Sequence, residues 1–290
     1  MNQHPAIQPG NTAVITGGAS GIGLAAARKL HALGMNVLIA DANADALREA
    51  HNQLHEIAGN PEGGQYGSMC VDVSDPKAIG ELLKEALSDP GPVTVLMNNA
   101  GVGRGGHAFQ NPDGWRRVLE TNLFGVLNGV QAFTQSMIDH GKPAVIINTG
   151  SKQGITCPPG DTAYNVSKAG IKVLTEGLQH TLRNTPGCQV SAHLLVPGST
   201  FTGMTARSGA AKPPGAWTAD QVAEFMLERL AAGDFYILCP DNDVTREIDN
   251  ARMDWAMDDL ILNRPPLSRW HPDSAHAFAA FLAERTGRRG

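Results

Sequence analysis

The amino-acid sequence predicts an α/β fold, a doubly wound parallel sheet with helices on both faces. Short apolar runs bounded by turn residues are typical of buried strands, and segments with helical spacing of apolar residues lie between them. Strands that alternate with helices along a chain are typical of parallel sheets. The residue patterns that suggest chemistry follow the ends of these strands, where such sheets bind their ligands.

The strands are expected at residues 12–16, 35–40, 65–73, 93–97, 144–148, 189–196 and 234–239. The helices are expected at residues 24–33, 45–57, 78–87, 115–140 and 162–183, with two more at 244–263 and 273–285. We therefore expect a single domain over residues 1–290, with a core of about 10–240 and a helical C-terminal extension of about 241–290. Residues 201–217 are rich in Gly and Pro and suggest a mobile lid over a fairly apolar substrate.

The composition excludes several classes of function. A net charge of −5 gives no electrostatic basis for binding nucleic acid or an anionic membrane. No apolar run approaches the ~20 residues needed to span a bilayer, and the N-terminus lacks the pattern of a signal peptide. The four cysteines are scattered, with no spacing typical of metal ligands, so no metal is expected. We expect a cytoplasmic enzyme.

The first strand ends in a glycine-rich turn with the spacing Gly17-x-x-x-Gly21-x-Gly23, and a helical pattern follows. Strand, glycine-rich turn and helix together present backbone N–H groups and a helix N-terminus to a pyrophosphate. This turn by itself is weak evidence, because any tight turn can contain such glycines. The candidate cofactor-binding residues here are Gly17, Ser20, Gly21, Ile22 and Gly23.

Asp41 ends the second strand, 18 residues after Gly23, close to the spacing expected for a carboxylate that holds a ribose 2′-hydroxyl group. A carboxylate at this place would repel the 2′-phosphate of NADP, and no Arg stands at Ala19, Ser20 or Ala42 to receive one. We therefore expect NAD rather than NADP. The alternative is that Asp41 or Asn43 caps the helix that follows.

Two later strand ends add candidate cofactor contacts. Asp72 ends the third strand, where it could meet an adenine amino group or cap the next helix. After the fourth strand, small residues would let a base or ribose lie against the backbone. The candidates at these two positions are Asp72, Val73, Asn99, Ala100 and Gly101.

Tyr164 and Lys168 are four residues apart, so on a helix their side chains lie side by side. An ammonium group beside a phenol favours the phenolate and lowers the phenol pKa, which would make Tyr164 a proton donor and acceptor near neutral pH. Ser151 follows the strand at residues 144–148 and could hydrogen-bond the same substrate oxygen. The alternative is an amphipathic helix on which Tyr164 and Lys168 occur by chance.

These motifs occur together, in order and at the expected intervals, so the chain resembles the short-chain dehydrogenase/reductase family over roughly residues 10–240. The residues that carry the resemblance are Thr16 to Gly23, Asp72, Asn98 to Gly101, Asn122, Ser151, Tyr164 with Lys168, and Pro197 with Gly198.

The resemblance implies a Rossmann-like fold, a nicotinamide cofactor and a catalytic group of four residues. In that scheme Ser151 orients the carbonyl or hydroxyl group and Tyr164 transfers the proton. Lys168 lowers the Tyr164 pKa and holds the nicotinamide ribose, while Asn122 keeps a water in a proton relay. The resemblance also implies cofactor contacts from Tyr164, Lys168, Pro197, Gly198, Thr200 and Thr202, and a homodimer or homotetramer formed through the helices that carry Asn122 and Tyr164.

Three features depart from the family pattern. Lys152 is more polar than the small residues usual after the serine, and it could either charge the pocket or point to solvent. Thr200 replaces the usual Val or Ile. The chain also continues for about fifty residues beyond the last expected strand, and this extension is a candidate for closing the active site.

The sequence therefore predicts an NAD-dependent oxidoreductase that interconverts a secondary alcohol and a ketone. The alternative from another class is a catalytically idle NAD-binding or regulatory protein on the same fold. A Rossmann-like methyltransferase has no use for Tyr164 with Lys168, and an NADP-linked acyl-carrier reductase is disfavoured by Asp41.

Overall fold

The computed structural model describes residues 3–57, 64–88, 91–203 and 211–287. Its main sheet is wholly parallel, with the strand order β3-β2-β1-β4-β5-β6-β9. This order confirms the predicted doubly wound, Rossmann-like α/β fold. The strands are β1 (Thr12–Thr16), β2 (Asn36–Asp41), β3 (Tyr66–Cys70), β4 (Val93–Asn98), β5 (Ala144–Thr149), β6 (Val190–Val196) and β9 (Tyr236–Leu238).

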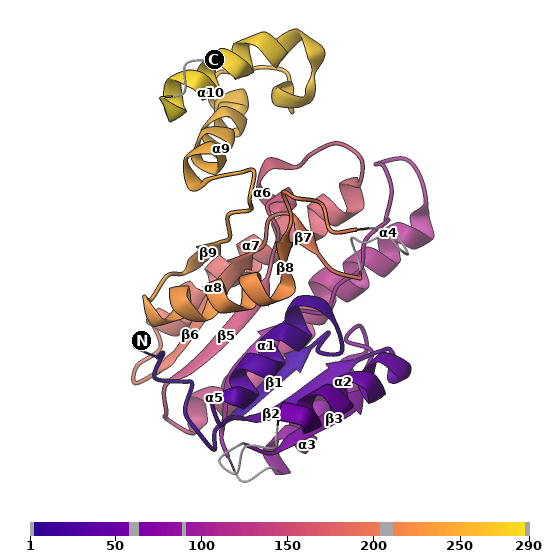
Figure 1. Cartoon of the computed structure of the whole chain (residues 1–290), viewed down its shortest axis with the longest axis vertical. Coiled ribbons are helices and arrows are strands. Elements are labelled where there is room, and N and C mark those ends of the chain that lie inside the picture. Colours follow the sequence, from indigo (N-terminus) through magenta and orange to yellow (C-terminus); the bar gives the residue numbers. More distant parts are fainter. Residues whose placement is uncertain (1–2, 58–63, 89–90, 204–210, 288–290) are drawn as a thin grey trace.

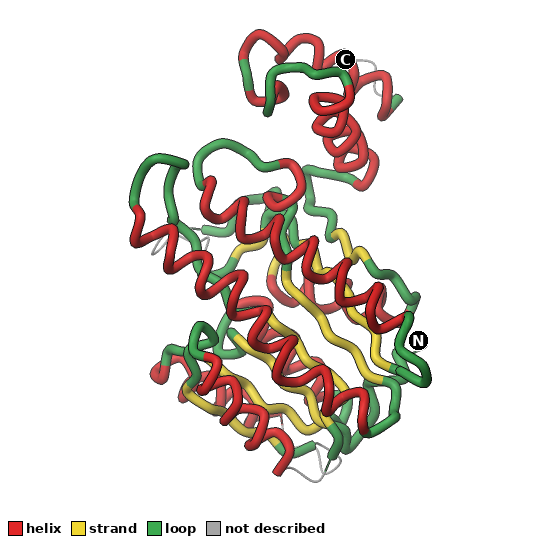
Figure 2. The backbone as a smooth tube through the Cα atoms, turned by 180° about the vertical axis from the view of Figure 1, so that it is seen from behind, coloured by secondary structure: helices red, strands yellow, loops and turns green. Residues whose placement is uncertain are grey.

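Helices cover both faces of this sheet, as Figures 1 and 2 show from opposite sides. On one face, Ile15 and Ile39 pack with α1 (Gly21–Ala32), α2 (Ala44–Ile57) and α8 (Ala219–Ala231). On the other face, Val14 and Leu38 pack with α3 (Pro76–Ser88), α5 (Gly125–Asp139) and α7 (Thr162–Arg183). Alternate residues of each strand point to opposite faces, so strands covered on both sides must be apolar throughout.

The predicted helix over residues 115–140 is in fact three pieces. α4 (Pro112–Leu119) begins earlier than predicted, because the Asn111 side chain accepts a hydrogen bond from the Gly114 backbone at 3.1 Å and Pro112 fits the first helical turn. A π-helical turn, η1 (Glu120–Phe124), separates α4 from α5. Such turns are rare and occur frequently at functional sites. This one carries Asn122, which is fully buried.

Other boundaries also differ from the sequence prediction. β3 ends at Cys70, three residues earlier than predicted. The sequence analysis did not predict α8, although Thr218 and Gln221 form a capping box at its N-terminus. It also missed the short helix α6 (Gln153–Thr156) and the two-residue strands β7 (Thr200–Phe201) and β8 (Trp217–Thr218), which pair with each other. This pairing joins the two ends of the expected lid, of which residues 204–210 lie outside the described structure.

The C-terminal extension forms a small helical unit of its own. It contains α9 (Arg246–Ile261), the 3₁₀ turns η2 (Ser268–Trp270) and η3 (Pro272–Ser274), and α10 (Ala275–Thr286). Figure 1 shows α9 and α10 standing away from the sheet, at the end of the molecule where α6 lies. Trp255 is its centre: its ring lies 5.4 Å from that of Phe278 and 5.2 Å from that of Phe281, and its indole N–H donates to Ser268 Oγ at 2.8 Å. Within the described residues, no helix is long and apolar enough to cross a membrane.

Candidate active site

A cavity of about 480 Å³ lies at the carboxyl ends of the strands. It brings together almost every residue that the sequence analysis selected, although those residues come from many separate loops. The selected residues that line it are Gly17, Ser20, Gly21, Ile22, Asp41, Asp72, Val73, Asn99, Ala100, Gly101, Ser151, Tyr164, Lys168, Pro197, Gly198, Thr200 and Thr202. Gly23 and Asn122 do not line it.

The glycine-rich turn brings its backbone close to the cavity and to the end of β4. Gly17 and Gly21 have φ angles of +62° and +54°, a region that favours glycine, and a Cβ on Gly17 would lie 2.7 Å from Ala100 Cα. Within the described chain, the side chain of the N-cap residue Ser20 makes no capping hydrogen bond at the start of α1. The first N–H groups of this helix therefore suit a phosphate group, and the turn fits a dinucleotide.

Gly23 has a different role from the other glycines of this turn. A Cβ on Gly23 would lie 2.3 Å from the carbonyl oxygen of Gly17 and 2.6 Å from Asn99 Nδ2. The sequence analysis grouped Gly23 with the cofactor contacts. The structure instead places it where α1 packs closely against the end of β1, so it shapes the turn rather than the cavity surface.

Asp41 lies at the end of β2 with its carboxylate next to the glycine-rich turn. One oxygen accepts a hydrogen bond from the Ala19 backbone at 3.3 Å, and the other accepts one from the Asn43 backbone at 3.0 Å. The cap of α2 is Asn43, whose side chain accepts hydrogen bonds from the Asp45 and Ala46 backbones. The capping role is therefore taken by Asn43, and the Asp41 carboxylate faces the cavity.

Asn99 cross-links the ends of three neighbouring strands. Its side-chain amide donates to the Gly17 carbonyl at 3.1 Å, and its side-chain oxygen accepts from the Thr149 hydroxyl at 3.3 Å. Its backbone N–H donates to the Thr16 hydroxyl at 3.0 Å. These bonds hold the β1, β4 and β5 ends at fixed spacing across the floor of the cavity.

Ser151, Tyr164 and Lys168 meet on the β5 and α7 side of the cavity. The Ser151 hydroxyl lies close enough to the Tyr164 phenol to lower its pKa, and Lys168 Nζ lies 5.6 Å from the centroid of the Tyr164 ring. Lys168 is buried, and its ammonium donates to the Thr149 carbonyl at 2.8 Å. Burial lowers the Lys168 pKa from 10.5 to about 8.

The expected lowering of the Tyr164 pKa does not occur in the chain alone. Burial of the phenol raises its pKa, the hydrogen bond from Ser151 lowers it, and the Asp161 charge raises it further. Burial disfavours the charged phenolate by more than the Ser151 hydrogen bond favours it. Lys168 itself holds its charge less strongly than an exposed lysine, because it too is buried.

Asn122 binds the loop after β4 to the helix that carries Tyr164. Its side-chain oxygen accepts from the Val102 backbone at 2.7 Å, and its amide donates to the Val102 carbonyl at 2.9 Å and to Ser167 Oγ at 3.1 Å. The buried Asn122 side chain is therefore satisfied by Val102 and Ser167. These partners are protein groups behind the cavity wall.

Asp161 is a site residue that the sequence analysis missed. Its carboxylate caps α7 by accepting from the Tyr164 backbone at 3.2 Å, and it also accepts from the backbones of Arg104 at 2.8 Å and of Gly105 and Gly106 at 3.1 Å. It thus fixes the loop opposite Tyr164. An Asp directly before a predicted helix start is a cap signal that could have identified it.

Arg117 is a second missed residue, and nothing in the sequence distinguishes it. It extends from α4 to line the cavity, and its guanidinium donates to the Gly103 carbonyl at 2.8 Å.

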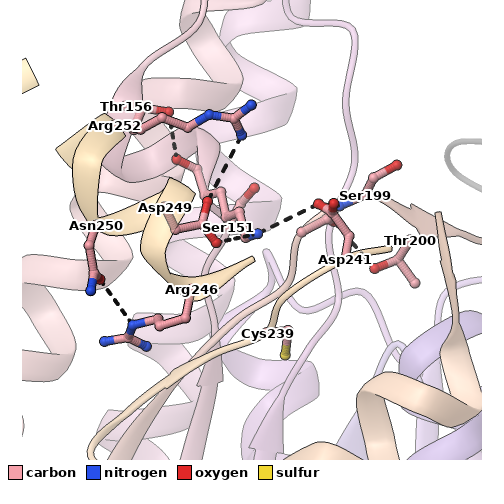
Figure 3. A network of polar contacts seen from close by, with 12 residues as sticks. Ser151, Thr156, Ser199, Thr200, Cys239, Asp241, Arg246, Asp249, Asn250 and Arg252 are labelled. Atoms are coloured by element: carbon pink, nitrogen blue, oxygen red, sulfur yellow. Dashed lines mark hydrogen bonds and ion pairs between the residues drawn. The ribbon is translucent and has the colours of Figure 1, made fainter. Parts of the chain in front are cut away.

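Lys152 connects the active site to the C-terminal extension. It does not point to solvent: Lys152 Nζ lies 2.5 Å from Asp249 Oδ2 and 3.5 Å from Asp241 Oδ2, and the three side chains are largely buried. Figure 3 shows these contacts as dashed lines that run from Asp249 to Asp241 through one amino group. Asp241 Oδ2 also accepts from the Ser199 backbone at 3.3 Å. The extension therefore contacts both the residue after Ser151 and the loop after β6.

Comparison with known proteins agrees with this geometry. A family model described as "short chain dehydrogenase" matches residues 11–213. Among curated proteins, the chain is 33% identical to 1-deoxy-11-beta-hydroxypentalenate dehydrogenase from Streptomyces exfoliatus, a match covering 78% of this chain and 81% of the relative. It is 31% identical to 3beta-hydroxysteroid dehydrogenase 2 from Eggerthella lenta, covering 69% of this chain and 75% of the relative.

Solved structures of relatives contain either nicotinamide cofactor. A short chain dehydrogenase/reductase from Burkholderia phymatum in complex with NAD has a TM-score of 0.79 and 32% identity, with 89% of this chain and 96% of that one covered. A metagenomic short-chain oxidoreductase in complex with NADP has a TM-score of 0.65 and 28% identity, with 80% and 98% covered. The chain therefore belongs to the short-chain dehydrogenase/reductase family of NAD(P)-dependent oxidoreductases.

Proposed function

We propose that this protein is an NAD-dependent dehydrogenase that interconverts a secondary alcohol and a ketone, with Tyr164 as the general acid and base. The observation that carries the proposal is the convergence of Ser151, Tyr164 and Lys168 on a cavity that Asp41 lines at another strand end. A protein that only binds a nucleotide has no need for the first three side chains together.

In the proposed chemistry, a bound nicotinamide cofactor exchanges a hydride with the substrate and the chain exchanges a proton with it. The cofactor, when bound, supplies or accepts a hydride. The Tyr164 phenol passes its proton to the carbonyl oxygen during reduction and takes it back during oxidation. The Ser151 hydroxyl orients that oxygen by a hydrogen bond of its own. The Lys168 ammonium, 5.6 Å from the centroid of the Tyr164 ring, would favour the phenolate and would hold the ribose of a bound cofactor.

Asn122 and Asp161 support this arrangement in the proposal. Asn122 holds the loop after β4 against α7, so Tyr164 keeps its distance from the cofactor-binding loops. Asp161 caps α7 three residues before Tyr164 and fixes the loop at residues 104–106. Both therefore act on the position of the phenol.

The preference for NAD over NADP rests on Asp41. Its carboxylate is held at the cavity wall by two backbone N–H groups, a geometry that suits a ribose diol and repels a 2′-phosphate. Among the described residues that line the cavity, the cations are Arg117 and Lys168, which belong to α4 and α7. Neither lies in the segment around Asp41.

A fairly apolar alcohol is the proposed substrate class. The two curated relatives named above are, by their names, dehydrogenases of a hydroxypentalenate and of a 3β-hydroxysteroid. Both names denote compounds with a hydroxyl group on a carbon skeleton. This agrees with the few charges in the stretch between β7 and β8.

A homodimer or homotetramer is proposed through η1, α5 and α7. Phe124, Val166 and Val173 are large apolar side chains that are 49%, 44% and 65% exposed on these elements. Val166 and Val173 are seven residues apart on α7 and so share one helix face. Light scattering on the purified chain tests this assembly, and a monomer at micromolar concentration would refute it.

Turnover with NAD and with NADP tests the enzymatic proposal, using apolar secondary alcohols and ketones that include polycyclic ones. We expect NAD-linked turnover that falls by at least about a hundredfold in Tyr164→Phe, in line with the contribution of a positioned general acid or base. Tyr236→Phe is the matched control, because Tyr236 is half exposed on β9 and bonds Glu176 away from the cavity.

Three outcomes would contradict parts of the proposal. Tight NAD binding without turnover on the whole panel favours the idle nucleotide-binding protein. Equal loss in Tyr164→Phe and Tyr236→Phe argues against a specific role of Tyr164. Preference for NADP, or an unchanged preference for NAD in Asp41→Ala, refutes the role given to Asp41.

A further inference from the structure

A second cavity, of about 420 Å³, lies between α6 and the C-terminal extension. One wall is the end of α6, which follows directly after Ser151 and Lys152 in the chain. The opposite wall is formed by α9 and by the segment that leads to η2. Its lining residues are separate from those of the first cavity, so it is a second space beside the candidate active site.

Positive charge in this cavity exceeds negative charge. Three arginines line it, with Asp259 as the acidic residue among its described lining. Arg264 is satisfied by Asp259, at 3.0 Å from its Nε, and by the Trp255 carbonyl at 2.7 Å. The guanidinium groups of Arg252 and Arg269 are left to face the cavity.

Arg252 is incompletely paired. Its nearest carboxylate oxygen is Asp249 Oδ1 at 4.0 Å, and the other oxygen of Asp249 lies 2.5 Å from Lys152. Arg252 Nε is buried and has no hydrogen-bond partner among the described residues. The charge of Arg252 is therefore only partly neutralised by its long ion pair with Asp249.

Arg269 lies over aromatic rings rather than beside an acid. Its guanidinium carbon is 4.2 Å from the Trp270 ring centroid and 5.2 Å from that of Phe278, and no ion pair with a carboxylate links it to the described chain. Burial and the positive charge of Arg252 lower the Arg269 pKa to about 10, although the negative charge of Asp249 acts in the opposite direction. Two cations that repel each other at a cavity wall attract an anion placed between them.

Apart from Thr156 and Asn263, the rest of the wall is largely apolar. Ile155 of α6 lies on one side, and Leu260, Leu267 and Trp270 lie on the other. The last three are 78%, 43% and 41% exposed, which is unusual for large apolar side chains gathered in one place. Such a wall favours a ligand whose body is apolar.

We propose that this cavity binds the anionic head group, carboxylate or phosphate, of a small molecule with an apolar body. Arg252 and Arg269 hold the head group, and Ile155, Leu260 and Trp270 contact the body. The ligand bridges α6 and α9 and therefore fastens the extension to the segment that follows Ser151. This site does not depend on the proposed dehydrogenase activity.

Isothermal titration calorimetry on the full chain tests the site with decanoate, decyl phosphate and decanol as probes. We expect decanoate or decyl phosphate, or both, to bind at least about tenfold more tightly than decanol, the loss expected when a charged hydrogen-bond partner is removed. The tighter of the two anions identifies the head group. Arg252→Met and Arg269→Met should each weaken anion binding by about tenfold or more.

Arg285→Met is the matched control, because Arg285 also belongs to the extension but pairs with Asp254 and does not line the cavity. Arg252→Lys and Arg269→Lys keep the charge, so they should bind with intermediate affinity and exclude a simple folding defect. Hydrogen exchange gives an independent readout: the anion should slow exchange of backbone amides in α6 and α9 in the wild type and in Arg285→Met.

Three results would overturn the proposal. If decanol binds as tightly as both anions, the charge of the head group contributes nothing and the site recognises only the apolar body. Equal anion affinity in wild type, Arg252→Met and Arg269→Met would remove the arginines from the site. Absence of anion binding at millimolar concentration would dismiss the cavity as a ligand site.

Discussion

Replacing Lys168 with Met tests the electrostatic description of the candidate active site. Lys168 is buried, and this burial lowers its pKa from 10.5 to about 8. The unfolded chain therefore keeps the lysine proton to a higher pH than the folded chain does. Below about pH 8 both states carry the charge, and the cost of burying the ammonium is fully present. As pH rises towards about 10.5, this cost disappears and the wild type gains stability.

The size of the effect follows from the two pKa values. A lowering from 10.5 to about 8 corresponds to about 3 kcal/mol of unfolding free energy. About 2 kcal/mol of this should be recovered between about pH 7 and about pH 9.5. Lys168→Met has no titrating group at this position. The lost hydrogen bond to the Thr149 carbonyl costs the variant about 1 kcal/mol at either pH.

Urea unfolding followed by circular dichroism, without added cofactor, measures the effect. The free energy of unfolding of Lys168→Met minus that of the wild type should fall by about 2 kcal/mol between the two pH values. Lys172→Met is the control, because Lys172 lies on the same helix, partly exposed, and pairs with Glu176. A pH-dependent change in Lys168→Met no larger than that in Lys172→Met would refute the reasoning.

Three further predictions concern the neighbouring residues. Gly23→Ala places a Cβ 2.3 Å from the Gly17 carbonyl oxygen and should cost about 1–3 kcal/mol in thermal unfolding. The control is Gly80→Ala on α3, which has open space around it and should be neutral or stabilising. Equal melting temperatures for the two variants would contradict this packing. Asp161→Asn removes a charge that raises the Tyr164 pKa, so the basic limb of the pH profile of kcat/KM for ketone reduction should move to lower pH, and an unmoved limb would count against Tyr164 as the general acid. Lys152→Met leaves Asp241 and Asp249 facing each other and should cost about 3 kcal/mol in urea unfolding. Adding Asp249→Asn to this variant should restore part of the lost stability. If the costs of the two substitutions simply add in the double variant, the ion pair is refuted.

The contacts of Lys152 give the C-terminal extension a defined connection to the site. Asp241 and Asp249 follow β9, outside the region matched by the family model, yet both bind the residue after Ser151. The extension is thus attached through buried charges, while much of the α9 and η2 surface stays apolar and exposed. A movement of the extension that displaced Lys152 would therefore also shift Ser151, its neighbour in the chain.

The sequence by itself determined the fold class and most of the residues that line the cavity. Short apolar runs and the glycines that end them are local properties, and in a parallel sheet the carboxyl ends of all strands lie at the same edge. For this reason Gly17, Asp41 and Asn99, which are far apart in the chain, could be assigned to one site before any coordinates were known. The helix from Thr162 to Arg183 was predicted with its observed limits, because Asn184 to Gly187 form a clear stop.

Only the tertiary structure decided which partners each polar side chain meets. Three features depend on packing between segments that are remote in sequence. They are the π-helical turn that buries Asn122, the raised pKa of Tyr164, and the ion pairs of Lys152 with two distant carboxylates. Burial controls the cost of a charge, and burial is a property of the folded chain rather than of a local pattern. That Arg252 and Arg269 both line the second cavity could not be predicted from the sequence for the same reason.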